Sequence, residues 1–132
     1  MNKEIRKNQT GYGKMWKSKG DGSEYVGEIV KGRPQGFGTL TTSDGLTYVG
    51  EFLNGLPNGK GIEIHGNSME TLEGIRYEGN FENGLYEGKG MITIPFGNKY
   101  EGHFRKGRPD GDLTVTTIEG ENYLEDGLFK KE

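Results

Sequence analysis

The sequence contains no cysteine and no alanine, and only two of its 132 residues are histidine. The absence of cysteine excludes disulfide bonds and thiolate metal sites. Alanine is the best helix former and glycine is among the worst, so a chain with no alanine and 25 glycines is not expected to be helical. The composition instead predicts β structure with many tight turns.

Long apolar segments are also missing. The first ten residues, MNKEIRKNQT, lack the apolar core of a signal peptide, and no apolar run approaches the roughly 18 residues that a membrane span needs. We therefore expect a soluble protein with a cytoplasmic location.

The chain has no excess of basic residues, with 17 Lys and Arg against 20 Asp and Glu. This balance gives no support to nucleic-acid binding, which normally requires a basic face. The charge is uneven, because residues 1–20 carry net +5 and the remaining residues carry net −8, against −3 for the whole chain. Residues 1–10 are predicted to be a basic, mobile leader. The basic side chains of the first 20 residues are Lys3, Arg6, Lys7, Lys14, Lys17 and Lys19.

A repeat runs through the rest of the chain. Its units start at tyrosines spaced by 23, 29, 23 and 23 residues, namely Tyr25, Tyr48, Tyr77, Tyr100 and Tyr123. Glycines follow the first four tyrosines at fixed positions, in the pattern Y-x-G-x-x-x-x-G-x-x-x-G-x-G. The fourth unit has Leu113 in place of the last glycine.

This pattern resembles the MORN repeat, and residues 25–38 and 48–61 fit it throughout. The resemblance covers residues 11–129, and we interpret residues 11–132 as one array. Its full units are 25–47, 48–76, 77–99 and 100–122, with half-units at 11–24 and 123–129. The sequence departs from the pattern in two places: about six extra residues lie within 65–74, and Glu125 replaces a glycine.

Each unit is predicted to be a β-hairpin. The segments Gly32–Gly36, Gly55–Gly59 and Gly107–Gly111 each contain a proline and are predicted to be its turns, and Tyr86 replaces that proline in the third unit. A second turn, such as Ser43–Gly45, would lead into the next unit. The expected fold is all-β, a single-layered antiparallel meander in which each strand pairs with its sequence neighbour.

One face of this sheet is predicted to be an aromatic ladder, because side chains alternate along a strand. The ladder has two interpretations: its rings pack over bare glycine backbone as the core of the sheet, or its groove also accepts an apolar or extended segment of a partner. The 65–74 insert is either a tolerated loop or a binding loop. The partner-binding candidates are Tyr48, Phe52, Tyr77, Phe81, Tyr100 and Phe104 on the ladder, with Met69 and Leu72 in the insert.

Residues for catalysis are scarce. His65 and His103 do not form a spaced metal-binding pair, and Glu28 and Glu51 occupy equivalent places on what we expect to be solvated surface. No helix follows the Gly-x-Gly segments to present its N-terminus to a phosphate. We predict no catalytic residue, no cofactor and no metal.

The predicted function is a non-catalytic protein–protein interaction or scaffolding module, such as a small docking inhibitor or an assembly factor. The resemblance implies scaffolding roles and dimerisation, here through a terminal edge strand. One alternative is binding to anionic phospholipid through the basic residues of the first 20 positions. Another is an accessory substrate-binding array of an enzyme whose catalytic domain lies elsewhere.

Overall fold

The computed structural model describes residues 11–17, 22–66 and 74–125. All the regular secondary structure in these ranges is β-strand. The strands are β1 (Gly11–Lys17), β2 (Glu24–Val30), β3 (Arg33–Thr41), β4 (Thr47–Leu53), β5 (Leu56–Ile64), β6 (Arg76–Glu82), β7 (Leu85–Thr93), β8 (Lys99–Arg105), β9 (Arg108–Pro109), β10 (Leu113–Thr116) and β11 (Asn122–Glu125).

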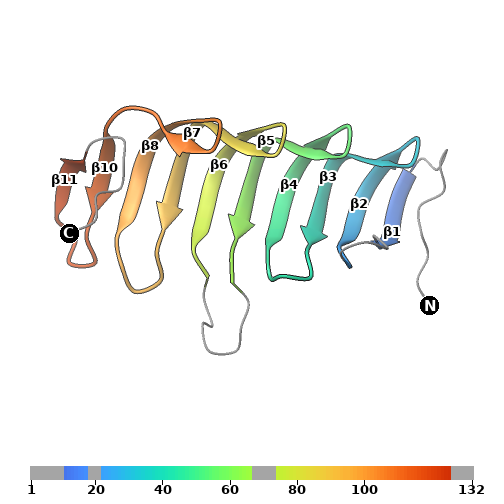
Figure 1. Ribbon diagram of the computed structural model, residues 1–132, viewed down its shortest axis with the longest axis horizontal. Helices are drawn as coiled ribbons and strands as arrows, with labels where there is room; N and C mark the ends of the chain where they lie inside the picture. The colour runs from blue at the N-terminus through green and yellow to red at the C-terminus, as the bar shows by residue number, and fades with distance from the viewer. Residues whose placement is uncertain (1–10, 18–21, 67–73, 126–132) are drawn as a thin grey trace.

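The strands form one open antiparallel sheet (Figure 1). Each strand pairs with its neighbours in sequence from β1 to β8, then β8 pairs with β10 and β10 with β11, while the short β9 also pairs with β8. This order confirms the predicted single-layered meander of hairpins. In the sequence, the insert of the second unit falls between β5 and β6.

The hairpin turns differ from the prediction. Within the units they are two-residue turns at Lys31–Gly32 and its equivalents, not the proline-containing segments that follow. In one of them Asn54 and Gly55 have φ values of +52° and +90°. Two consecutive positive φ angles define the type I′ turn, whose backbone twist matches that of the flanking strands. Pro34 lies inside β3, opposite Ile29 of β2.

The predicted turns between units are confirmed. The chain reverses at residues 42–46 between β3 and β4, where the amide of Gly45 donates to the carbonyl of Thr42 at 3.2 Å. An equivalent reversal at residues 94–98 joins β7 to β8.

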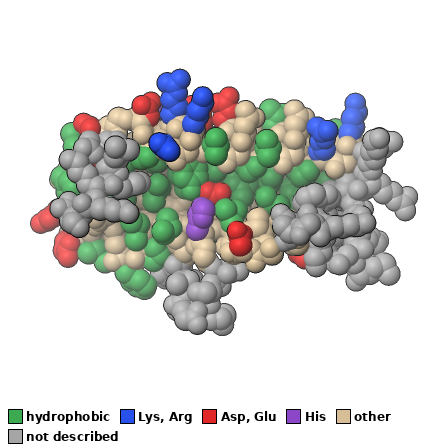
Figure 2. All heavy atoms as spheres, viewed as in Figure 1, with side chains coloured by type: hydrophobic (Ala, Val, Ile, Leu, Met, Phe, Trp, Pro, Cys, Tyr) green, Lys and Arg blue, Asp and Glu red, His purple; other side chains and the backbone are tan. Residues whose placement is uncertain are grey.

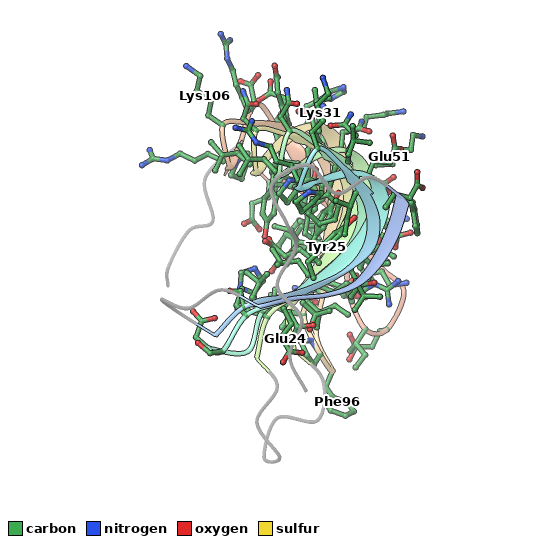
Figure 3. All side chains as sticks on the ribbon, turned by 90° about the vertical axis from the view of Figure 1, so that its right-hand side faces the viewer. Glu24, Tyr25, Lys31, Glu51, Phe96 and Lys106 are labelled. Atoms are coloured by element: carbon green, nitrogen blue, oxygen red, sulfur yellow. The ribbon has the colours of Figure 1, made fainter. Side chains whose placement is uncertain are left out.

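The sheet is curled across its strands, so that it is C-shaped when viewed end-on (Figure 3). Tyr25 points into the concave side and Glu51 points away from the convex side. The concave side holds the core, whose large buried side chains are Tyr25, Ile29, Tyr48, Phe52, Tyr77, Phe81, Phe104 and Leu113. The single layer therefore buries its apolar face by curling around its own rings.

The rings form a continuous chain of edge-to-face contacts. The Phe52 ring lies 5.0 Å from both Tyr25 of the preceding unit and Tyr48 of its own unit. Phe81 repeats this arrangement at 4.9 Å from Tyr48 and 5.1 Å from Tyr77. Edge-to-face pairs at such distances stabilise by about 0.5–1.5 kcal/mol each beyond the area that they bury. Each phenylalanine therefore connects two successive units.

Glycines make room for the rings. A Cβ at Gly38 would lie within 2.5 Å of the Tyr25 ring, and a Cβ at Gly61 would meet the Tyr48 ring equally closely. These glycines pair across strands with further glycines, as Gly38 does with Gly50. The predicted packing of aromatic rings over glycine backbone is thus the basis of the core.

Candidate functional site

The six ladder candidates lie together on the concave side, but most of them have no surface to offer. Tyr48, Phe52, Tyr77, Phe81 and Phe104 are each at most 3% exposed. Tyr100 is half-buried. Met69 and Leu72 lie outside the described residues. Any partner on this face would therefore contact the side chains that cover the ladder rather than the ladder itself.

An outer layer of partly buried side chains packs against the ladder. Its members are Leu40, Leu46, Tyr86, Ile92 and Tyr100. Figure 2 looks onto the concave side and shows hydrophobic side chains across the middle of the sheet, with a histidine and carboxylate side chains among them. The concave face thus presents an apolar band with a polar group near its middle.

The polar group begins with Glu63 of β5. Glu63 is paired with Tyr48 of β4 on one side and with Tyr77 of β6 on the other, so its side chain lies on the concave face with theirs. The equivalent positions of the other units, each 15 residues after the unit's first tyrosine, hold Leu40, Ile92 and Val115. The Glu63 side chain is only 13% exposed. A carboxylate has therefore replaced a core hydrophobe in this unit alone.

His65 and Tyr86 complete the group. The Nε2 atom of His65 lies 3.1 Å from the Glu63 carboxylate and 3.4 Å from the Tyr86 hydroxyl. Tyr86, on β7, stacks on Tyr77 with parallel rings 3.7 Å apart. We name Glu63, His65 and Tyr86 the polar cluster. Sequence reasoning missed it, although comparison of the units position by position shows that Glu63 and Tyr86 both break the repeat.

The tyrosines of this region are held in their neutral form. Burial is the main cause that raises the pKa of Tyr77 to about 12, and its hydroxyl donates to the carbonyl of Asn80 at 2.8 Å. Burial, followed by a hydrogen bond to Glu63, also raises the pKa of Tyr86. Both tyrosines therefore favour the folded chain while they remain protonated.

From these shifts we expect the array to lose stability in alkali. An unfolded tyrosine ionises near pH 10, whereas Tyr77 ionises near 12 when folded, so its contribution is fully present below about pH 10 and disappears as the pH rises toward 12. Urea unfolding followed by circular dichroism should show a falling midpoint above about pH 10. Tyr77→Phe should make this fall less steep. A midpoint that stays constant up to about pH 11.5 would contradict the expectation.

We expect the Glu63 carboxylate to lower the stability of the fold. Replacing it with leucine restores the hydrophobic type that the other units have at this position, and exchanging buried polar groups for packed hydrophobes is often stabilising. We expect Glu63→Leu to raise the unfolding free energy by about 1 kcal/mol and the melting temperature by roughly 4 °C. Glu78→Leu is the matched control, because Glu78 is exposed on the convex side and carries the same charge. A lower melting temperature for Glu63→Leu would show that the carboxylate supports the fold.

The convex face has a groove over the row of paired glycines. It has a volume of about 500 Å³ and is lined by residues that include Phe37, Val49, Ile62, Lys60 and Glu78. Phe37 is 57% exposed at one end of it. This groove is the second candidate surface, and sequence analysis did not identify it.

Glu28 and Glu51, which occupy equivalent places in successive units, each bind a backbone amide. Glu28 accepts a hydrogen bond from the amide of Phe37 at 3.1 Å, and Glu51 accepts one from the amide of Lys60 at 3.2 Å. Each carboxylate therefore binds the backbone of its own hairpin. The other histidine, His103, is exposed.

The remaining candidates are only partly described. Lys14 and Lys17 belong to β1, whose side chains are not described, while Lys3, Arg6, Lys7 and Lys19 lie outside the described residues. At the other end of the sheet, β11 pairs with β10 on one side only, as far as residues 22–66 and 74–125 show. Homodimerisation through such an edge stays a prediction.

The described ranges contain no group of three or more histidine and acidic side chains that could hold a metal ion. None of their segments forms a helix of the length and apolar character that spans a bilayer.

Comparison with known proteins identifies the repeat. The MORN repeat family model matches residues 25–47, 48–69, 77–98 and 100–111, which together make up more than half of the chain. The matches begin at the tyrosines that open each unit. No curated protein matches the chain. MORN repeats are generally involved in binding proteins or membrane lipids. The chain belongs to the MORN-repeat family.

Proposed function

We propose that the array is a non-catalytic protein-interaction module and that an extended segment of its partner lies along the concave face. The observation that carries this proposal is the band of half-buried apolar side chains, Leu40, Leu46, Tyr86, Ile92 and Tyr100, which packs on a continuous aromatic core. Exposed apolar surface on a rigid sheet suits the recognition of another protein.

The mode of binding follows from the geometry. A segment along the band would cross the strands, whose backbone amides and carbonyls are already used in pairing within the sheet. Strand addition therefore does not apply on this face, and recognition would depend on side chains. Family membership supports the proposed interaction module, because MORN repeats are typically protein-interaction modules.

The test is affinity capture from the native host with two kinds of variant. Ile92→Lys and Leu40→Lys place a charge in the concave band, whereas Phe37→Lys places the same charge on the convex face, where Phe37 is exposed. We expect one stoichiometric partner that both concave variants lose and the convex variant keeps. Thermal unfolding of each variant confirms that it is folded. Loss by Phe37→Lys alone would move the partner to the convex groove, and the absence of any stoichiometric partner would contradict an interaction module.

Binding to anionic phospholipid is a second candidate, favoured by basic residues at the edge formed by the two-residue turns (Figures 2 and 3). The exposed ones are Lys31, Arg33, Arg105, Lys106 and Arg108. Each basic residue near an acidic bilayer contributes about 1 kcal/mol, while the acidic body of the array opposes binding. Phosphatidylserine vesicles should sediment the full chain at low salt, and Lys31→Gln with Lys106→Gln should weaken this. No sedimentation of the unchanged chain would dismiss this candidate.

A further inference from the structure

We propose that the polar cluster is a specificity pocket that receives a lysine or arginine side chain of the bound segment. This inference rests on the proposed function, because it needs a segment that lies on the concave face. It adds the chemical identity of one residue of that segment. The elements that build the pocket are β5 and β7, with β6 between them.

Departures from the repeat converge at this one place. Glu63 replaces a core hydrophobe of the second unit, and Tyr86 replaces the proline of the third unit. His65 follows Glu63 where the 65–74 insert begins. Glu63 lies opposite Tyr77 of β6, and the Tyr86 ring from the next unit stacks on that same tyrosine, so side-chain packing brings the exceptions of two units together. Positions where a sequence breaks the rules of its own fold are expected at functional sites.

The chemistry of the pocket favours a cation. Among the described residues, the Glu63 carboxylate contacts the His65 ring and the Tyr86 hydroxyl, and no lysine or arginine is paired with it. The carboxylate is mostly removed from solvent, which strengthens its attraction for a positive charge. It lies opposite Tyr48 of β4 and Tyr77 of β6, whose rings are buried, so the attraction for an ammonium or guanidinium group comes from the carboxylate itself.

The surroundings point in the same direction. The chain beyond its first 20 residues carries net −8, which would attract a basic segment and repel an acidic one. On either side of the pocket the concave face is apolar, with Leu40 toward the N-terminal end and Ile92 toward the C-terminal end. The preferred segment would therefore carry one basic side chain flanked by apolar ones.

A purely structural role for the cluster makes a different prediction. If Glu63 served only to hold the start of the insert, its replacement would weaken the fold and leave peptide preference unchanged. If it serves as a pocket, Glu63→Leu should keep or raise stability and change the preference from basic to apolar. Binding and stability must therefore be measured on the same variants.

The experiment is selection from a displayed library of random nine-residue peptides on the full chain. Glu63→Leu and the convex control Glu78→Leu are selected in parallel, because each removes one negative charge. The unchanged chain and Glu78→Leu should enrich peptides with lysine or arginine at one common position, and Glu63→Leu should enrich apolar residues there. The best arginine peptide and its citrulline analogue are then titrated by fluorescence anisotropy. We expect citrulline to weaken binding about 10-fold on the unchanged chain and to have no effect on Glu63→Leu.

The outcomes separate the two proposals. Peptides that bind without a common basic position, or an equal effect of citrulline on Glu63→Leu, would overturn the pocket and leave the interaction module standing. A basic preference lost on Glu78→Leu but kept on Glu63→Leu would assign the cation to the convex face and overturn the pocket as well. Failure of all three proteins to enrich any peptide would contradict both the pocket and segment binding on the concave face.

Discussion

Replacing Gly61 with alanine should lower the free energy of unfolding by about 3 kcal/mol, the upper part of the range for overpacking a core. The added Cβ would lie 2.4 Å from two atoms of the Tyr48 ring, Cε1 and the hydroxyl oxygen. That ring cannot retreat, because it is fully buried with Phe52 at 5.0 Å and Phe81 at 4.9 Å. Urea unfolding followed by far-UV circular dichroism measures the change.

Gly55→Ala is the matched control for this prediction. A Cβ at Gly55 would have no heavy atom within 4 Å, but its φ of +90° is unfavourable for alanine. Backbone strain alone should cost about 1 kcal/mol. Gly61 has no positive φ, so its cost would come from the ring contact. Equal losses for the two variants would show that the glycines serve backbone freedom and not the packing of the tyrosines.

The ladder could be predicted from the sequence because two periodicities agree. The unit length places the tyrosines in equivalent strands, and strand alternation places Tyr48 and Phe52 on the same face. Local patterns of this kind do not depend on distant contacts. The structure adds only the curl of the sheet, which turns the ladder from an exposed face into a buried core.

The predicted position of the hairpin turns was wrong because the prediction relied on the prolines. Pro34 and Pro57 suggested turns at their own positions, yet each lies in a strand, opposite Ile29 and Phe52 respectively. The Asn54–Gly55 pair is a strong signal for a type I′ hairpin, and it was present in the sequence. Proline was tolerated within the strand next to a register shift, where regular pairing is interrupted.

The polar cluster could be predicted only in part. Comparison of the units reveals that Glu63 and Tyr86 are exceptions, but they are 23 residues apart and belong to different units. Their proximity depends on Tyr77 of β6, which lies opposite Glu63 and carries the stacked Tyr86 ring. The insert between β5 and β6 hides this arrangement in the sequence, because its length makes the first residue of β6 hard to predict.

Successive units in this array are joined by strand pairing and by a few buried aromatic rings. Phe81 is 3% exposed and joins Tyr48 of the second unit to Tyr77 of the third, on opposite sides of the insert. In repeat proteins each unit contacts only its neighbours, and cooperativity depends on the free energy of these interfaces. Removal of one interface therefore affects both the total stability and the way in which the two halves unfold.

Phe81→Ala should lower the free energy of unfolding by about 4 kcal/mol, as expected for truncation of a buried phenylalanine. It should also split the transition, so that the units before the insert and the units after it unfold at different urea concentrations. Hydrogen exchange measured by mass spectrometry on peptides from β2–β5 and from β6–β10 would resolve the two halves. Phe37→Ala, on the exposed convex face, should change stability by less than about 0.5 kcal/mol. A single transition with equal exchange in both halves would mean that backbone pairing between β5 and β6, and not the ring, couples the units.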